Sequence, residues 1–426
     1  MDAIVANGYL APMLYTVAFL TALGLSLAVE LWLDQRQMRA VRGHRERVPE
    51  AFRARVSLAE HQKAADYTLA RLRLARVARL WDAAVLLWWT LGGGLQWAWD
   101  LTGDWGLAGL HRGVGVIVVV GLLSALLHLP FSIYRTFVIE ARFGFNRTTP
   151  ALFVTDLVKG TALALALGVP LLYLILWLME RAGPGWWLWA WAAWFGFTLL
   201  LSWAYPTLIA PLFNRFTPLE DASLRQAIED LLARSGFHSR GIYVMDGSRR
   251  SGHGNAYFTG LGRNKRIVFF DTLLETLSPD ETLAVLAHEL GHYHYRHVLK
   301  GLLLSAVSSL LGFAVLAWLL PQPAFYHGLG VATPALPLGL LLFVLVAPVF
   351  TFFLQPLMAW YSRRHEFQAD CYAARQTSAR DLISALVRLY RDNASTLTPD
   401  PLYSDFHDSH PPAPVRIRHL QQCARH

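Results

Sequence analysis

Seven long runs of apolar residues alternate with polar segments along the chain. Each run has roughly 20 residues or more, the length that an α-helix needs to cross the hydrocarbon core of a bilayer. The pattern therefore predicts a mainly α, polytopic membrane protein with about seven transmembrane helices. The runs cover Tyr9–Leu33, Leu80–Leu101, Val114–Tyr134, Ala151–Met179, Trp186–Pro206, Val298–Leu320 and Ala335–Trp360.

Two polar stretches divide the chain into four parts. The membrane region 1–213 contains five predicted helices, and the polar segment 214–297 follows it. Two more membrane helices lie in 298–360, and 361–426 is a polar C-terminal segment. In the first polar segment, an amphipathic helical pattern reaches about Arg234 and three β-type runs follow, which predicts an α+β domain outside the membrane. The β-type runs are Gly241–Met245, Asn255–Thr259 and Arg266–Phe270.

The composition is typical of a lipid-exposed surface. Only 16% of the residues are charged, whereas about 25% is usual in soluble proteins. The formal net charge is +8, but the basic residues lie mainly in loops beside the apolar runs, where lipid headgroups explain them better than nucleic acid. We therefore expect the lipid bilayer as a partner and no nucleic acid. Cys371 and Cys423, the only cysteines, fall in segments predicted to be cytoplasmic, so we expect neither a disulfide framework nor a cysteine-based zinc site.

The loop charges orient the predicted helices. The loop between the first two runs is rich in arginine, Thr102–Gly113 has Arg112 as its only basic residue, and Pro321–Pro334 has no Lys, Arg, Asp or Glu. Because basic loops stay on the cytoplasmic side, this alternation places the N-terminus outside and both polar segments in the cytoplasm. We expect a multi-pass protein of a bacterial inner membrane or of the endoplasmic reticulum.

Glu30, His128 and Asp156 are among the ionisable residues that lie inside the apolar runs. Ionisable groups at such depth face protein or a water-filled cavity instead of lipid. The sequence does not assign an individual role to any of the three, and packing between helices is the default interpretation.

The strongest chemical signal is the motif HELGH at residues 288–292. The Ser-Pro-Asp-Glu run that begins at Ser278 is typical of a helix start with a capping box. On one helix, His288 and His292 lie four residues apart on the same face, so both imidazoles can bind one metal ion. Glu289 lies beside them, where its carboxylate can take a proton from an attacking water whose pKa zinc lowers. The motif predicts a zinc-dependent protease.

A catalytic zinc ion needs a third protein ligand and one open position. Metzincin spacing requires a histidine where Val298 stands, which excludes that class. His294 and His297 also miss this spacing, and we interpret them as helix-end or membrane-interface residues. Glu366 and Asp370 lie four apart on a predicted helix, so one carboxylate can bind the metal while the other accepts a hydrogen bond from a ligand imidazole. The spacing alone leaves open a solvated cluster of charges.

An ordered series of further motifs covers most of the chain beyond Ala64. With these motifs the chain resembles the CAAX prenyl protease 1 family, zinc metalloproteases of the endoplasmic-reticulum membrane and their bacterial relatives. The motifs are PFS at 130–132, TFVIE at 136–140, FGFN at 143–146, YPTLIAPLFN at 205–214, MDGSRRS at 245–251, NAYF at 255–258, IVFFDTL at 267–273, RHEFQAD at 364–370 and HPP at 410–412.

The resemblance implies roles that the spacing leaves open. It implies that Glu366 is the third zinc ligand, that Asp370 supports a ligand imidazole, and that Arg416 lies near the metal. It implies that His410 donates to the oxyanion of the scissile carbonyl. It also implies seven helices around a water-filled chamber, with a zincin-like protease domain at the cytoplasmic end. An extended substrate peptide would pair with an edge strand that contains Asn255, Ala256 and Tyr257.

The sequence thus predicts a membrane zinc endopeptidase that binds one Zn²⁺ ion and cleaves membrane-associated or prenylated CAAX-type peptides. A general quality-control protease without prenyl dependence is one alternative. A transporter or a non-catalytic clamp at a translocation channel is another, although such a scaffold has no need of Glu289. An intramembrane site-two protease is disfavoured, because charged residues flank the motif and 298–360 contains no aspartate.

Overall fold

Most of the chain is helical. The computed structural model describes residues 2–237, 239, 241–259 and 266–425. Its α-helices are α1 (Asp2–Gly43), α2 (Leu58–Trp89), α3 (Gly94–Asp104), α4 (Gly109–Tyr134), α5 (Pro150–Arg181), α6 (Trp186–Ala204), α7 (Ala210–Phe213), α8 (Ala222–Arg234), α9 (Asp271–Thr276), α10 (Pro279–His294), α11 (His297–Leu319), α12 (Pro323–Gly328), α13 (Leu336–Thr351), α14 (Gln355–Gln376), α15 (Ala379–Asp392), α16 (Pro401–His407) and α17 (Ala413–Cys423).

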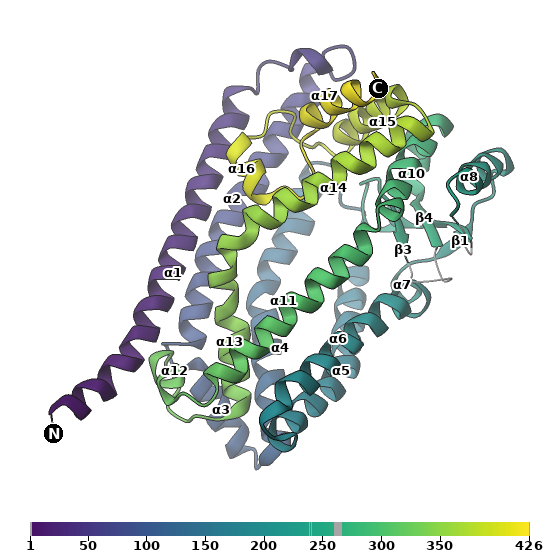
Figure 1. Cartoon of the computed structure of the whole chain (residues 1–426). Helices are drawn as coiled ribbons and strands as arrows, with labels where there is room; N and C mark the ends of the chain where they lie inside the picture. The colour runs from purple at the N-terminus through teal and green to yellow at the C-terminus, as the bar shows by residue number, and fades with distance from the viewer. Residues whose placement is uncertain (1, 238, 240, 260–265, 426) are drawn as a thin grey trace.

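The long helices run along the molecule, and the polar segments gather at one end. Figure 1 shows α10, α14, α15 and α17 at the end where the C-terminus lies, with the N-terminus at the opposite end. The two polar segments, far apart in the sequence, therefore form one cap on the helical body. A buried apolar cluster that includes Phe19, Trp89, Leu95 and Leu342 fills the body.

Six helical stretches in the described part of the chain are long and apolar enough to span a membrane. The multi-pass, mainly α class is thereby confirmed, whereas the enclosed chamber stays a prediction. The missing seventh stretch is the run predicted at Leu80–Leu101, which two helices share, because α2 ends at Trp89 and α3 begins at Gly94. Gly93 between them adopts a left-handed conformation with φ of 77°, which glycine tolerates at no steric cost.

Glu30 and His128 each lie beside a charged or polar partner on α2. Glu30 forms an ion pair with Arg79, with 2.6 Å between Glu30 Oε2 and Arg79 Nε. His128 lies 2.7 Å from the Asp82 carboxylate, also on α2. These pairs satisfy polar groups between neighbouring helices, as packing requires at this depth.

Asp156 connects the membrane helices to the cap. Both of its carboxylate oxygens accept from Arg250, at 2.8 and 2.9 Å. The same guanidinium donates to the Asn214 side chain and to the Phe213 carbonyl oxygen at the end of α7. Arg250 thus joins α5, α7 and the start of the polar segment at one point.

A small mixed sheet lies in the cap. Its strands are β1 (Phe216–Pro218), β2 (Ile242–Met245), β3 (Ala256–Thr259) and β4 (Arg266–Phe270), in the order β1-β2-β4-β3. The last three confirm the predicted β-type runs, and β1 is an addition. β2 and β4 are parallel, and the other two pairs are antiparallel. Among the described residues β3 pairs only with β4, which makes it an edge strand of this sheet.

The cysteines differ from our expectation. Cys371 in α14 and Cys423 at the end of α17 form a disulfide, with Cα atoms 5.4 Å apart. The expectation used only the predicted compartment and the small number of cysteines. It missed that α17 folds back onto α14 and brings together residues that are 52 positions apart. His419 of α17 lies beside the pair, with Nε2 3.3 Å from Cys371 Sγ.

Candidate metal centre

Helix α10 begins with the predicted capping box. The Ser278 hydroxyl accepts from the Glu281 backbone N–H, and the Glu281 carboxylate accepts from the Ser278 backbone N–H at 2.9 Å. Pro279 occupies the first helical turn, where no intrahelical donor is lost. This start fixes the helical phase, so that His288 and His292 lie on the same face of α10.

A glycine allows the second ligand-bearing helix to approach. A Cβ atom on Gly291 would lie 2.7 Å from the Ala369 Cα atom of α14, which is closer than real Cβ contacts come. The two helices therefore pack backbone against backbone at this point. The close approach places Glu366, one turn before Ala369, opposite the histidines of α10.

Two imidazoles and one carboxylate, those of His288, His292 and Glu366, form a triangle of possible ligands, in which each histidine lies nearest to a different oxygen of Glu366. His288 Nε2 lies 3.3 Å from His292 Nε2 and 3.4 Å from Glu366 Oε2, and His292 Nε2 lies 3.3 Å from Glu366 Oε1. Tetrahedral coordination at the usual zinc distances places ligand atoms about 3.3 Å apart. Glu366 Oε2 is buried without a hydrogen-bond partner. The triangle therefore fits a metal ion, and Glu366, the predicted third ligand, lies beside both histidines.

The Asp370 side chain orients one imidazole. Its carboxylate is fully buried and lies 2.9 Å from His288 Nδ1, while the Arg416 guanidinium donates to both of its oxygens. Burial and Arg416 act to lower the pKa of His288, but the Asp370 and Glu366 carboxylates outweigh them and raise it to about 9. The surroundings thus favour positive charge at this point, which suits a divalent cation.

The other imidazole has a support that sequence reasoning missed. His292 Nδ1 lies 3.0 Å from His297 Nδ1, and His297 Nε2 lies 2.9 Å from Gln368 Oε1 on α14. Helical spacing could not reveal this contact, because α10 ends before His297. Arg296, between the two helices, has a φ of 56°, and α11 starts at His297. The only sequence signal is the density of histidines after the motif.

The predicted catalytic side chains lie beside the triangle. Glu289 is half-buried and has no hydrogen bond or ion pair with any residue that the structure describes. His410, from the loop between α16 and α17, has Nε2 3.3 Å from Glu366 Oε1, and its side chain is 63% exposed. Both can therefore meet a bound peptide. Whether they act on it stays a prediction.

The predicted substrate strand lies at the open edge of the sheet. Asn255 precedes β3, and its carbonyl oxygen accepts from the Phe270 N–H on the inner side of the strand. Ala256 and Tyr257 lie in β3 and pair with β4. The opposite edge of β3 carries no strand among the described residues, so it can pair with an extended peptide.

Two family models match the chain. "CAAX prenyl protease N-terminal, five membrane helices" matches residues 37–215, and "Peptidase family M48" matches residues 218–424. The CAAX prenyl protease 1 homolog of Arabidopsis thaliana is 36% identical over 407 residues, covering 91% of this chain and 93% of the relative. CAAX prenyl protease 1 of Saccharomyces cerevisiae is 40% identical over 314 residues, covering 70% and 69%.

A solved structure shares the fold. The crystal structure of S. mikatae Ste24p superposes with a TM-score of 0.89 at 31% sequence identity, covering 95% of this chain and 98% of that one. The similarity therefore includes the membrane helices as well as the cap. It confirms the resemblance that the motifs suggested.

Proposed function

The chain belongs to the CAAX prenyl protease 1 family of membrane metalloendopeptidases, peptidase family M48, and we propose that it cleaves prenylated CAAX-type peptides with zinc as its metal. The observation that carries this proposal is the triangle of His288, His292 and Glu366, whose spacing suits tetrahedral zinc. Three protein ligands leave one coordination position open, as a catalytic site requires.

The chain's own residues would prepare the ligands for the ion. Asp370 accepts the Nδ1 proton of His288, which leaves the Nε2 lone pair free for the metal. His297 gives His292 the same support. A zinc ion bound there would polarise the scissile carbonyl and make water more acidic.

Glu289 is the proposed general base. Its carboxylate takes a proton from the attacking water and later delivers that proton to the leaving amine. Its position next to His288 on α10, half-buried but without a competing partner among the described residues, suits this exchange. His410 would donate a hydrogen bond to the carbonyl oxygen as negative charge develops on it.

The substrate backbone is proposed to pair with β3. Asn255, Ala256 and Tyr257 offer the free edge, and β3 lies in the same cap as α10. Basic loops on the side of the cap support the proposal that the active site faces the cytoplasm. The bilayer would bring membrane-anchored substrates to this end of the molecule.

Zinc content and cleavage of two fluorogenic peptides test the proposal. One peptide is farnesylated at a CAAX cysteine, and the other is identical but unprenylated. Both are incubated with the wild type and with Glu289→Gln in detergent. Cleavage of the farnesylated peptide alone, abolished in the variant, is the expected result.

The other outcomes separate the alternatives. Equal cleavage of both peptides would indicate a quality-control protease without prenyl dependence. Stoichiometric zinc without cleavage of either peptide would contradict the proposed substrate class, and absence of zinc would contradict the proposed metal.

A further inference from the structure

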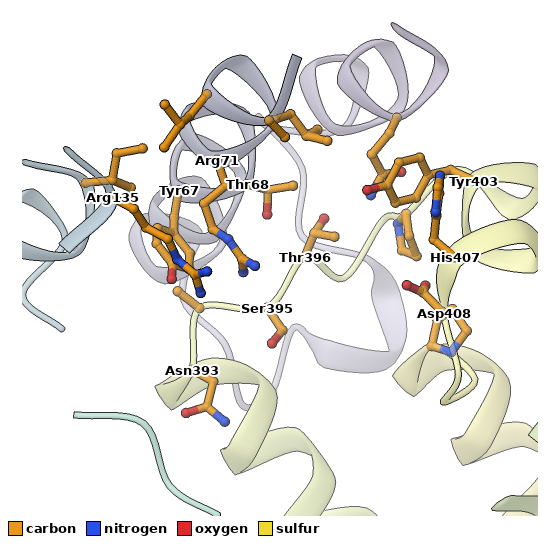
Figure 2. A pocket seen from close by; sticks show the side chains of 18 of the residues that line it. Tyr67, Thr68, Arg71, Arg135, Asn393, Ser395, Thr396, Tyr403, His407 and Asp408 are labelled. Carbon is orange, nitrogen blue, oxygen red and sulfur yellow. The ribbon is translucent and has the colours of Figure 1, made fainter. Parts of the chain in front are cut away.

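A cavity of about 720 Å³ opens beside the metal centre. Its walls come from α1 and α2, from the end of α4 and the π-helical turn Arg135–Glu140 that follows it, and from the segments that follow α15 and surround α16. Figure 2 shows Arg71 and Arg135 on the same wall as Tyr67, with His407 and Asp408 across the cavity. The mechanism described above uses none of these five residues.

The wall around Tyr67 is rich in positive charge. The Arg71 guanidinium lies 5.4 Å from the centre of the Tyr67 ring and has no ion pair with any residue that the structure describes. The Tyr67 hydroxyl donates to Glu140 at 2.7 Å, and Arg135 approaches the same carboxylate only to 3.8 Å. Asp408, on the far wall, already accepts from the Ser404 hydroxyl. Two guanidinium groups thus remain able to bind an anion.

The cavity continues from the catalytic site. His410, 3.3 Å from Glu366, lines one end of it. Asn393 lines it as well, and its Oδ1 atom accepts from the Gly254 N–H just before β3. The cavity therefore begins where the metal centre meets the N-terminal end of the edge strand.

The direction of a bound peptide follows from this position. A peptide that pairs antiparallel with β3 runs towards the N-terminal end of that strand, so its residues after the scissile bond enter the cavity. Three extended residues span about 10 Å, and a cavity of this volume is in the usual size range for ligand pockets.

We propose that Arg71 and Arg135 form a subsite for the free α-carboxylate at the C-terminus of the substrate. The two guanidinium groups would then hold the end of the short segment that cleavage of a CAAX-type peptide releases. Guanidinium groups match a carboxylate with paired hydrogen bonds, so the recognition is both electrostatic and geometric. This inference rests on the proposed peptidase function, because it assumes that the peptide occupies β3.

Equilibrium binding to the zinc-loaded Glu289→Gln variant tests the subsite without turnover. Two fluorescent peptides of identical sequence are compared, one with a free C-terminal acid and one with a C-terminal amide. We expect the acid to bind about tenfold more tightly, as one or two charge-assisted hydrogen bonds would give. Adding Arg71→Gln and Arg135→Gln together should bring the ratio of the two dissociation constants close to one.

Arg73→Gln is the matched control. Arg73 is an exposed arginine of the same helix, and it does not line this cavity. Replacement of Arg73 should leave the ratio of the dissociation constants of the acid and the amide peptide unchanged. The zinc content of each variant verifies that the metal site is folded. The subsite would be overturned if both peptides bound with equal affinity. It would also be overturned if Arg73→Gln reduced the preference for the acid as much as the two replacements at Arg71 and Arg135. If the acid bound about tenfold more tightly but the wild type cleaved neither peptide, the subsite would stand and only the peptidase proposal would be contradicted.

Discussion

Each imidazole of the metal centre uses both of its nitrogens. His288 directs Nε2 to the triangle and Nδ1 to Asp370, whereas His292 directs Nδ1 to another histidine. His297 can accept the His292 proton on Nδ1 only if its own proton is on Nε2, which faces Gln368 Oε1. This chain of contacts defines the tautomer in which His292 presents a lone pair to the metal.

Replacement of His297 by alanine should weaken zinc binding. The loss of a partner for a ligand imidazole typically costs about 10- to 100-fold in metal affinity. Competition with a chelator of known affinity measures this. His294→Ala is the control, because His294 is exposed and packs against Tyr372 instead of a ligand. Unchanged zinc affinity in His297→Ala would show that the contact has no role in positioning.

Glu289→Gln and His292→Ala should separate chemistry from binding. The amide of glutamine cannot take a proton, so Glu289→Gln should retain stoichiometric zinc and lose about 10²- to 10⁴-fold in kcat. His292→Ala should lose both zinc and activity, because it removes a ligand. Elemental analysis alongside peptide turnover measures both effects. Near-normal turnover in Glu289→Gln would refute the general-base role.

At the scale of elements, the contact between α10 and α14 determines whether the ligand set exists. Gly291→Ala places a methyl group 2.7 Å from the Ala369 Cα atom, so the helices must move apart. We expect a loss of about 1–3 kcal/mol in stability, together with weaker zinc binding, because Glu366 moves away from the histidines.

A second glycine serves as the control for this prediction. Gly301 lies in α11 with no atom within 4 Å of a Cβ that would be added there. Gly301→Ala should be neutral or slightly stabilising, by up to about 1 kcal/mol. Thermal unfolding in detergent compares the two variants. An equal effect of both substitutions would mean that helix propensity, and not packing, governs the result.

Helices and strands were predicted best from the sequence where their bounds depend on residues close to one another in the chain. The capping box at Ser278, the helix that ends at Arg234 and the strand that ends at Phe270 all depend on neighbouring residues. The break at Gly93 and the three-residue strand β1 were missed, because apolar content obscures a single turn and β1 depends on pairing with β2.

At the scale of the whole molecule, the site depends on contacts between distant segments. The motif identified His288 and His292, but spacing left Glu366 open, and only the family resemblance indicated it before the structure. His297 and Gln368 were not found from the sequence, because their contact requires the first residue of α11 to lie beside α14. No local pattern encodes such a contact.

The ion pair of Asp156 with Arg250, which connects the membrane helices to the cap, should contribute measurably to the stability of the fold. Asp156→Asn removes one charge from the pair with Arg250, in which both side chains are about three-quarters buried. Loss of a charge-assisted hydrogen bond predicts about 1.5–3 kcal/mol less stability, seen as a lower unfolding temperature in detergent.

Asp82→Asn is the matched control for the Asp156–Arg250 ion pair. The Asp82–His128 pair also connects two helices, but both side chains are about half exposed. Its loss should therefore change stability by less than the loss at Asp156. A larger loss of stability in Asp82→Asn than in Asp156→Asn would contradict the assignment of the Arg250 contacts as the main connection between membrane helices and cap.

The division of the ligand set between α10 and α14 has a consequence for biosynthesis. The ribosome releases the two histidines first, and Glu366 emerges only after α11 and α13 have been synthesised. A nascent chain that has not yet inserted this pair of helices carries an incomplete site. With the proposed ligand set, unfinished copies would be unable to digest one another, and hydrolytic activity would begin only after assembly in the bilayer.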